Sequence, residues 1–141
     1  MTYRFPSKEW TEAYRQAVNS NPAYAEAGKD WTHGTVALVV KADPTIGIEK
    51  DMAMLLDVHR GVCRSTRYDE AEKVREEAAF VVEAGYDLWR EVIDGKLDPT
   101  KGMMQGKLRL TKGHLPTMIR YVQSSKQLVA SAAQVPTDFL R

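Results

Sequence analysis

Glycine and proline recur through residues 95–113, and they divide this stretch into pieces too short for one long helix or strand. Pro99 predicts a turn or the start of a short helix, and Met103 and Met104 follow as two soft, flexible apolar side chains. Gly106 then leads into a strand in which leucines alternate with polar residues. The stretch contains no obvious catalytic group. It is therefore more typical of a pocket wall than of a reaction centre.

The length of 141 residues predicts a single domain over residues 1–141, long enough to remove about 70% of the unfolded surface from water. Hydrophobic residues make up 43% of the chain and charged residues 28%, as in ordinary soluble globular proteins. The net charge is +1, and lysines and arginines appear interspersed with acidic residues. This pattern predicts no nucleic-acid binding, and it similarly disfavours binding to a membrane surface.

The N-terminal residues MTYRFPSKEW lack the apolar core of a secretory signal, and the longest apolar runs are too short to cross a membrane. We therefore expect a cytoplasmic protein. Cys63 is the only cysteine, which excludes an intramolecular disulfide and a four-thiolate zinc site within the chain. The apolar core must hold the fold together.

The first half of the chain predicts two helices followed by three strands. Ser7 has the position of an N-cap before an amphipathic helix, and Asn21 with Pro22 begins a second helix that Gly28 ends. The three predicted strands cover residues 35–41, with both faces buried, residues 52–58, and residues 62–66, with a tight turn at Gly61 before the third.

The second half predicts two further strands separated by short helices. The charged residues 68–77 fit either a helix or a loop. The remaining predicted elements are a strand over 79–84, a helix over 87–94, a short helix over 100–104, a strand over 108–111 and one long helix from residue 114 or 115 through 129. Apolar residues in the tail, Phe139 among them, are expected to be at least partly buried. About five strands and as many helices indicate an α+β domain.

The order of several motifs resembles the SCP2 sterol-carrier family over most of the chain. These motifs are TVALVV, MAMLLDVHRG, AFVVEAGYDLW, GKLDP at residues 95–99 and GKLRL at residues 106–110. The resemblance implies a mostly antiparallel five-stranded sheet covered by helices, with a hydrophobic tunnel between the layers. It also implies noncatalytic binding and carrying of a fatty acid, fatty acyl-CoA, sterol or phospholipid. The chain does not end in the Ser-Lys-Leu type of peroxisomal signal.

The resemblance also implies a set of residues in the tunnel wall, with Trp89 in the aromatic position of its helix. The expected wall residues are Phe80, Val82, Trp89, Met103, Met104, Leu108, Leu110, Met118, Ile119 and Val122. Methionines suit a promiscuous apolar pocket because their thioether side chains adapt to ligands of different shape. Lys107 and Lys112 could meet a ligand carboxylate or phosphate at the tunnel mouth.

Two alternatives remain open from the residues alone. Asp57, His59 and Cys63 lie close together around a predicted hairpin, and they could serve a small enzyme as an orienting carboxylate, a base and a nucleophile. No metal site or cofactor is expected, because His33 and His114 are far from each other and from His59 in the sequence.

The second alternative is an interaction module, either a homodimer or an accessory subunit of an enzyme that metabolises lipids or acyl-CoA. The aromatic anchors would be Trp10, Tyr14, Tyr24 and Trp31, because aromatic residues are enriched at interfaces. For a lipid carrier we expect only transient contact with membranes.

Overall fold

The computed structural model describes residues 1–140, and its central element is a five-stranded sheet in the order β4-β3-β2-β5-β6. Only the β2·β5 pair is parallel, so the sheet is mostly antiparallel, as predicted. A separate parallel pair joins β1 to β7. The strands are β1 Tyr3–Phe5, β2 Val36–Val40, β3 Met52–His59, β4 Val62–Glu70, β5 Phe80–Ala84, β6 Arg109–Lys112 and β7 Thr137–Phe139.

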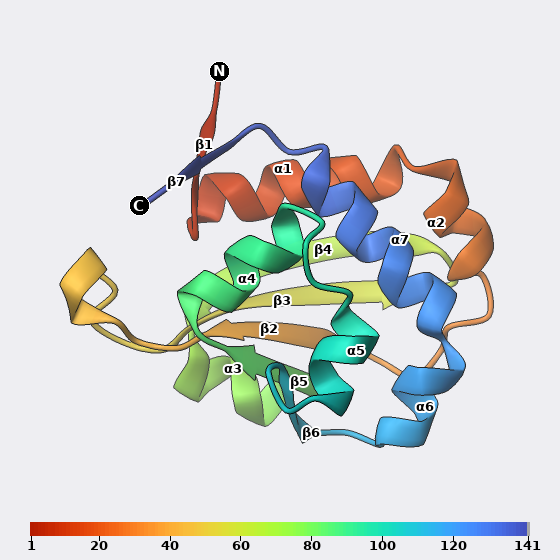
Figure 1. Cartoon of the computed structure of the whole chain (residues 1–141). Coiled ribbons are helices and arrows are strands. Elements are labelled where there is room, and N and C mark those ends of the chain that lie inside the picture. Colours follow the sequence, from red (N-terminus) through yellow and green to blue (C-terminus); the bar gives the residue numbers. More distant parts are fainter. Residues whose placement is uncertain (141) are drawn as a thin grey trace.

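Most of the helices lie on one face of this sheet, and α3 lies on the other (Figure 1). The helices are α1 Lys8–Asn19, α2 Pro22–Ala27, α3 Ala71–Glu77, α4 Tyr86–Ile93, α5 Pro99–Met104, α6 Leu115–Arg120 and α7 Val122–Ala133, with a 3-10 turn η1 at Pro44–Ile46. The predicted α+β class is confirmed. A helix with the length and apolar character needed to cross a bilayer is absent from residues 1–140.

The predicted caps begin the first two helices. The Ser7 hydroxyl accepts a hydrogen bond of 3.0 Å from the Trp10 N–H, and the Asn21 side chain accepts from the N–H groups of Ala23 and Tyr24. Each cap satisfies donors that the first turn of a helix leaves without partners. Local chemistry therefore sets the start of α1 and α2.

A tight turn at Arg60 and Gly61 joins β3 to β4, and both residues have positive φ angles, 49° and 82°. A side chain at Gly61 would also collide with the backbone carbonyl of Ala25 in α2, so the hairpin tip packs directly under that helix. β4 continues to Glu70, four residues beyond the predicted end of the strand. The ambiguous charged stretch is thus partly strand and partly α3.

The central strand β2 contributes to two separate cores. Val36, Leu38 and Val40 face the large core between the sheet and the main helical layer. Ala37 and Val39 face a smaller core in which α3 packs on the other side of the sheet. Because alternate residues of a strand point to opposite faces, the five apolar residues of β2 serve both cores.

The prediction of one long C-terminal helix is wrong, because the chain breaks between α6 and α7 at Tyr121 (φ −102°, ψ 38°). The Tyr121 ring packs edge-on against Trp31 at a centroid distance of 5.1 Å, and its hydroxyl donates to the Asp30 carbonyl at 3.3 Å. These tertiary contacts hold Tyr121 in a non-helical conformation despite the helical periodicity of the sequence.

The pairing of the two chain ends was not predicted. β1 runs parallel to β7, with Tyr3 opposite Thr137 and Phe5 opposite Phe139. The rings of Phe5 and Phe139 lie 6.3 Å apart, and the Arg90 guanidinium of α4 lies 4.6 Å from the centre of the Phe139 ring. The prediction that the tail is partly buried is confirmed.

A charged cluster ties α3 to the sheet on the side of the smaller core. The Arg75 guanidinium lies 2.6 Å from the Glu83 carboxylate and 2.8 Å from that of Asp51. Thr111 of β6 also donates to Glu83, at 2.6 Å. Burial raises the pKa of Asp51, but hydrogen bonds from Lys41, Arg75 and the Ala42 N–H outweigh it and lower this pKa to about 2. Burial and the opposing hydrogen bonds act in the same way on Glu83, whose pKa is also lowered.

We expect Arg75→Met to lower the free energy of unfolding at neutral pH by about 2 kcal/mol, because it leaves the nearly buried Glu83 without its main partner. In the wild type, both depressed carboxylates stabilise the fold above about pH 4, and this contribution disappears as the pH falls toward 2. Urea unfolding at a series of pH values should show that the free energy of unfolding decreases less with falling pH in the variant than in the wild type.

Arg67→Met provides the matched control, because Arg67 pairs with Glu77 at 2.7 Å on the protein surface. Exposed pairs of this kind contribute about 0.5 kcal/mol or less. Equal destabilisation by both substitutions, or an unchanged acid dependence in Arg75→Met, would contradict the role assigned to this cluster.

Candidate functional site

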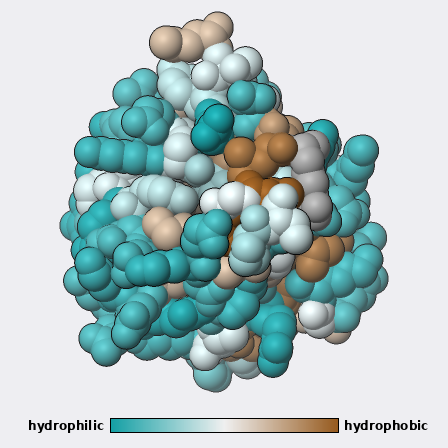
Figure 2. Space-filling view, turned by 90° about the vertical axis from the view of Figure 1, so that its left-hand side faces the viewer, coloured by the Kyte–Doolittle hydropathy of each residue, from teal (hydrophilic) through white to brown (hydrophobic). Residues whose placement is uncertain are grey.

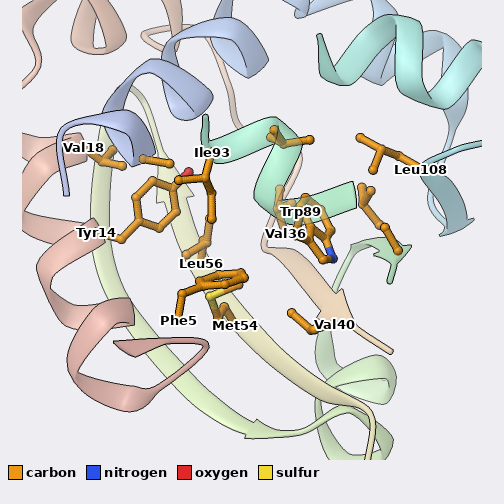
Figure 3. Packing of buried hydrophobic residues seen from close by; sticks show 14 of the residues in the cluster. Phe5, Tyr14, Val18, Val36, Val40, Met54, Leu56, Trp89, Ile93 and Leu108 are labelled. Carbon is orange, nitrogen blue, oxygen red and sulfur yellow. The ribbon is translucent and has the colours of Figure 1, made fainter. Parts of the chain in front are cut away.

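An apolar cavity of about 80 Å³ lies within the large core, between the sheet and the helices. Figure 3 shows part of the packing around it, with residues from β2, β3 and α4 pointing toward one another. Its wall consists of Phe5, Trp10, Tyr14, Val36, Leu38, Met54, Leu56, Val82, Trp89, Val92, Ile93, Pro99, Met103, Leu108, Met118, Ser125, Leu128, Val129 and Ala132. Apart from the aromatic residues, Ser125 is the only wall residue with a polar side chain.

The sheet forms the floor of the cavity through the inward positions of three neighbouring strands. Val36 and Leu38 come from β2, Met54 and Leu56 from β3, and Val82 from β5. The register pairs Val36 with Leu56 and Leu38 with both Met54 and Val82. The floor is therefore a continuous apolar surface that hydrogen bonds between strands hold in place.

Helices α4, α5 and α7 form the roof, and in α4 and α7 the wall residues are three or four positions apart. α4 contributes Trp89, Val92 and Ile93, and α7 contributes Leu128 and Ala132 among others. This spacing places the side chains on one face of each helix, which explains why the apolar face of α4 points inward.

The helix α5 approaches the strand side closely because it has a glycine at the contact. A side chain at Gly102 would lie only 2.9 Å from Cγ of Leu108, so only glycine allows this packing without a shift. The contact fixes the face of α5 that meets the core. Met103 consequently lines the cavity, whereas Met104 points outward and is 72% exposed.

The polar atoms of the aromatic wall residues all bind protein groups. The Trp89 indole N–H donates to the Val39 carbonyl at 2.8 Å, and the Trp10 indole N–H donates to the Thr137 hydroxyl at 2.9 Å. The Tyr14 hydroxyl donates to the Leu128 carbonyl at 3.0 Å, and burial raises the pKa of Tyr14. These three side chains therefore present hydrocarbon rather than hydrogen-bond donors to the cavity.

The structure brings together half of the wall residues expected from sequence. Val82, Trp89, Met103, Leu108 and Met118 line the cavity. The other five do not line it: Phe80 is buried elsewhere in the same core, Leu110 and Val122 are half-buried, and Met104 and Ile119 are exposed.

Most of the residues that sequence reasoning missed come from strands β2 and β3 and from helices α1 and α7. Leu38 and Met54 were recognised as strand residues but not as part of a wall. The sequence does contain a signal for the strand residues, because alternate positions of β2 and β3 share one face of the sheet. It does not tell which face the helices cover.

Two of the three residues considered for catalysis, Asp57 and Cys63, have partners outside the group. The Asp57 carboxylate accepts two hydrogen bonds from the Arg64 guanidinium, at 2.9 and 3.2 Å. Cys63 is buried, and its thiol donates to the Ser65 carbonyl at 3.6 Å. Desolvation raises the pKa of Cys63 to about 11, so the thiolate needed for nucleophilic attack is disfavoured at neutral pH.

The four aromatic residues considered as interface anchors lie in the core of their own chain. Trp10, Tyr14, Tyr24 and Trp31 are each at most 4% exposed. They pack within the large apolar cluster rather than on the surface.

A second, more open hollow lies at the end of the molecule where the chain termini meet, the side that faces the viewer in Figure 2. This face is mostly hydrophilic, and its apolar groups gather mainly in one patch. The hollow is lined by Ile46 and Leu140 but also by Arg4, Glu49 and Lys50. A hollow with charged walls is a poor site for a hydrocarbon chain, so the apolar cavity between the sheet and the helices is the better candidate.

Comparison with known proteins gives a consistent result. The sequence profile described as the SCP-2 sterol transfer family matches residues 12–116. No curated protein matches the chain. A crystal structure of sterol carrier protein 2 is 37% identical with a TM-score of 0.85, and the match covers 92% of this chain and 97% of that one.

A second structure, the solution structure of a conserved hypothetical protein from Thermus thermophilus, is 36% identical with a TM-score of 0.85. That match covers 94% of this chain and 90% of the other. Sterol carrier protein 2 from Yarrowia lipolytica is only 16% identical, with a TM-score of 0.55 over 88% of this chain and 89% of that one, and supports the fold alone. The chain belongs to the SCP-2 sterol transfer family.

Proposed function

We propose that this protein binds one hydrophobic ligand in the apolar cavity and carries it through water without changing it chemically. The observation that carries the proposal is the composition of the wall, which is almost wholly hydrocarbon and lies between the sheet and the helices. The name of one similar solved structure supports the same function, since that protein is a sterol carrier protein. The expected ligands are a fatty acid, a fatty acyl-CoA, a sterol or a phospholipid.

Binding would be driven by removal of apolar surface from water, at about 25 cal/mol per Å². Since the aromatic polar atoms are already engaged with protein groups, the cavity offers little to a polar headgroup. The acyl chain or ring system of the ligand would lie inside, and a carboxylate or phosphate would stay at the opening. Specificity should accordingly be broad.

A cavity of about 80 Å³ is smaller than the roughly 300 Å³ or more that typically holds a small-molecule ligand. Uptake of a long chain therefore requires the roof to move, because the floor is part of a hydrogen-bonded sheet. Methionines at positions 54, 103 and 118 can adopt several rotamers and so adapt the wall to different ligands.

The direct test is native mass spectrometry of the purified protein, with solvent extraction to identify any small molecule that co-purifies. One fatty acid, sterol or phospholipid per chain would support the proposal and give the class of ligand. A mass that remains that of the free protein after addition of fatty acids, sterols and acyl-CoA would refute it.

The neighbouring methionines of α5 provide a matched pair for locating the ligand. We expect Met103→Asp to weaken binding of a fluorescent fatty acid in solution at least about tenfold, because it places a carboxylate in the apolar wall. Met104→Asp should change the affinity by less than about twofold, since its side chain is exposed. Fluorescence titration without membranes measures both.

Thermal unfolding of both variants checks that the fold is retained, and Met103→Leu, which keeps the wall apolar, should bind as the wild type does. Equal losses in the two aspartate variants would place the ligand elsewhere.

The reactivity of the Cys63 thiol distinguishes a carrier from an enzyme that uses this residue as a nucleophile. Because desolvation raises the pKa of Cys63 to about 11, we expect iodoacetamide to label the folded protein far more slowly at pH 8 than the same protein in urea. Intact-mass analysis over time gives the two rates. Labelling in the folded state as fast as in urea would indicate an activated thiol and revive the enzymatic alternative.

A further inference from the structure

The charges of the chain are distributed unevenly, which the net charge of +1 conceals. Residues 99–137 contain no aspartate or glutamate, and the remainder has 14 basic against 19 acidic residues. The prediction that basic and acidic residues are interspersed along the chain is therefore wrong for this segment. Its basic residues are Lys101, Lys107, Arg109, Lys112, Arg120 and Lys126.

All six of these side chains belong to exposed residues. Within residues 1–140, no ion pair involves any of them, although the other basic residues form many such pairs. Lys112 alone has protein acceptors in its side-chain hydrogen bonds, the carbonyls of Arg75 and Glu76. The acidic residue just before the segment, Asp98, accepts from N–H groups of α5 as its N-cap. The segment thus presents positive charge that the protein does not neutralise.

The same segment carries exposed apolar side chains. Met104 is 72% exposed, Leu115 40% and Ile119 41%, and these are three of the five large apolar side chains exposed within residues 1–140. They come from α5 and α6, which lie at the same end of the molecule together with β6 (Figure 1, lower right). We call this surface, with Lys101, Lys107, Arg120 and Lys126, the α5–α6 surface. The two basic residues of β6 are not part of it, because Arg109 is paired with Glu83 and Lys112 with Val81 on the face of the sheet that α3 covers.

The α5–α6 surface is directly beside the cavity. Met103 and Met118 line the cavity, and they are the sequence neighbours of the exposed Met104 and Ile119. The two short helices therefore have one side in the cavity wall and the other side in water.

We infer that the α5–α6 surface docks on the surface of an anionic lipid bilayer. A bilayer interface accepts both components of this surface: the lysines and the arginine meet phosphate and carboxylate headgroups, and the apolar side chains enter the boundary with the acyl chains. Docking in this orientation brings the cavity wall next to the lipid. The phosphates of a nucleic acid would match the basic residues, but a nucleic acid would not match the exposed methionine, leucine and isoleucine.

The experiment measures cosedimentation of the ligand-free protein with vesicles of phosphatidylcholine, with and without phosphatidylserine, at low and at high salt. We expect binding that requires phosphatidylserine and weakens as salt rises. The variant Lys101→Gln/Lys107→Gln/Lys126→Gln should bind about 100-fold more weakly, since each basic residue near such a surface contributes about fivefold. Met104→Gln/Leu115→Gln/Ile119→Gln should also bind more weakly, including at high salt.

The matched control is Lys8→Gln/Lys29→Gln/Lys73→Gln, which removes three exposed lysines outside the segment and the same total charge. It should bind like the wild type. Equal losses in both lysine variants would reduce the effect to net charge and overturn the proposal. Equal binding to both kinds of vesicle would also overturn it. No binding to either kind would overturn it too, and is the result expected if the partner is an acidic protein. Thermal unfolding confirms that each variant is folded.

The docking experiment is independent of the proposed carrier function. The vesicle assay uses ligand-free protein, and fatty acid affinity is measured without vesicles. Loss of vesicle binding in the lysine variant with unchanged fatty acid affinity supports the α5–α6 surface. A protein that docks on vesicles but binds no fatty acid or sterol in solution would refute the carrier function and leave the docking surface in place.

Discussion

The strand β2 is the element on which the rest of the structure depends. It pairs with β3 on one side and with β5 on the other, and the second of these pairs is the only parallel one in the five-stranded sheet. Its side chains alternate between the floor of the cavity, through Val36 and Leu38, and the smaller core under α3, through Ala37 and Val39. Even the indole N–H of Trp89 binds the β2 backbone, at the Val39 carbonyl. The hydrogen bonds of β2 to both neighbouring strands thus hold the floor of the cavity in place.

Local signals in the sequence were sufficient for much of this architecture. Ser7 and Asn21 cap α1 and α2 as expected, and the alternation of apolar residues correctly located β2, β3 and β5. The parallel pair of β1 and β7 joins the two ends of the chain, and no local pattern in three-residue strands can reveal it. The break at Tyr121 likewise depends on its contacts with Trp31, which periodicity in a helix cannot report.

The cavity illustrates the same limit at finer scale. Met103 and Met104 look equivalent in the sequence, yet one lines the cavity and the other is mostly exposed. The difference comes from the close packing of Gly102 on Leu108, which sets the rotation of α5 about its axis. Resemblance to a family can indicate which segment forms a wall. Which side chain faces inward depends on the rotation of a helix, and a rotation of about 100° separates adjacent residues.

The helix α7 is attached to the body of the protein at both ends. At its start, Tyr121 is packed on Trp31 and hydrogen-bonded to Asp30. Beyond its end, β7 is paired with β1, and the Leu140 N–H donates to the Tyr86 hydroxyl at 2.6 Å. Because both of its ends are fixed, α7 is not free to swing away from the sheet as a rigid body about one end. Leu128 and Val129 near its middle line the cavity. We therefore expect a bound molecule to push α7 outward at its middle, so that the width of the ligand, more than its length, determines the free energy needed to deform the roof.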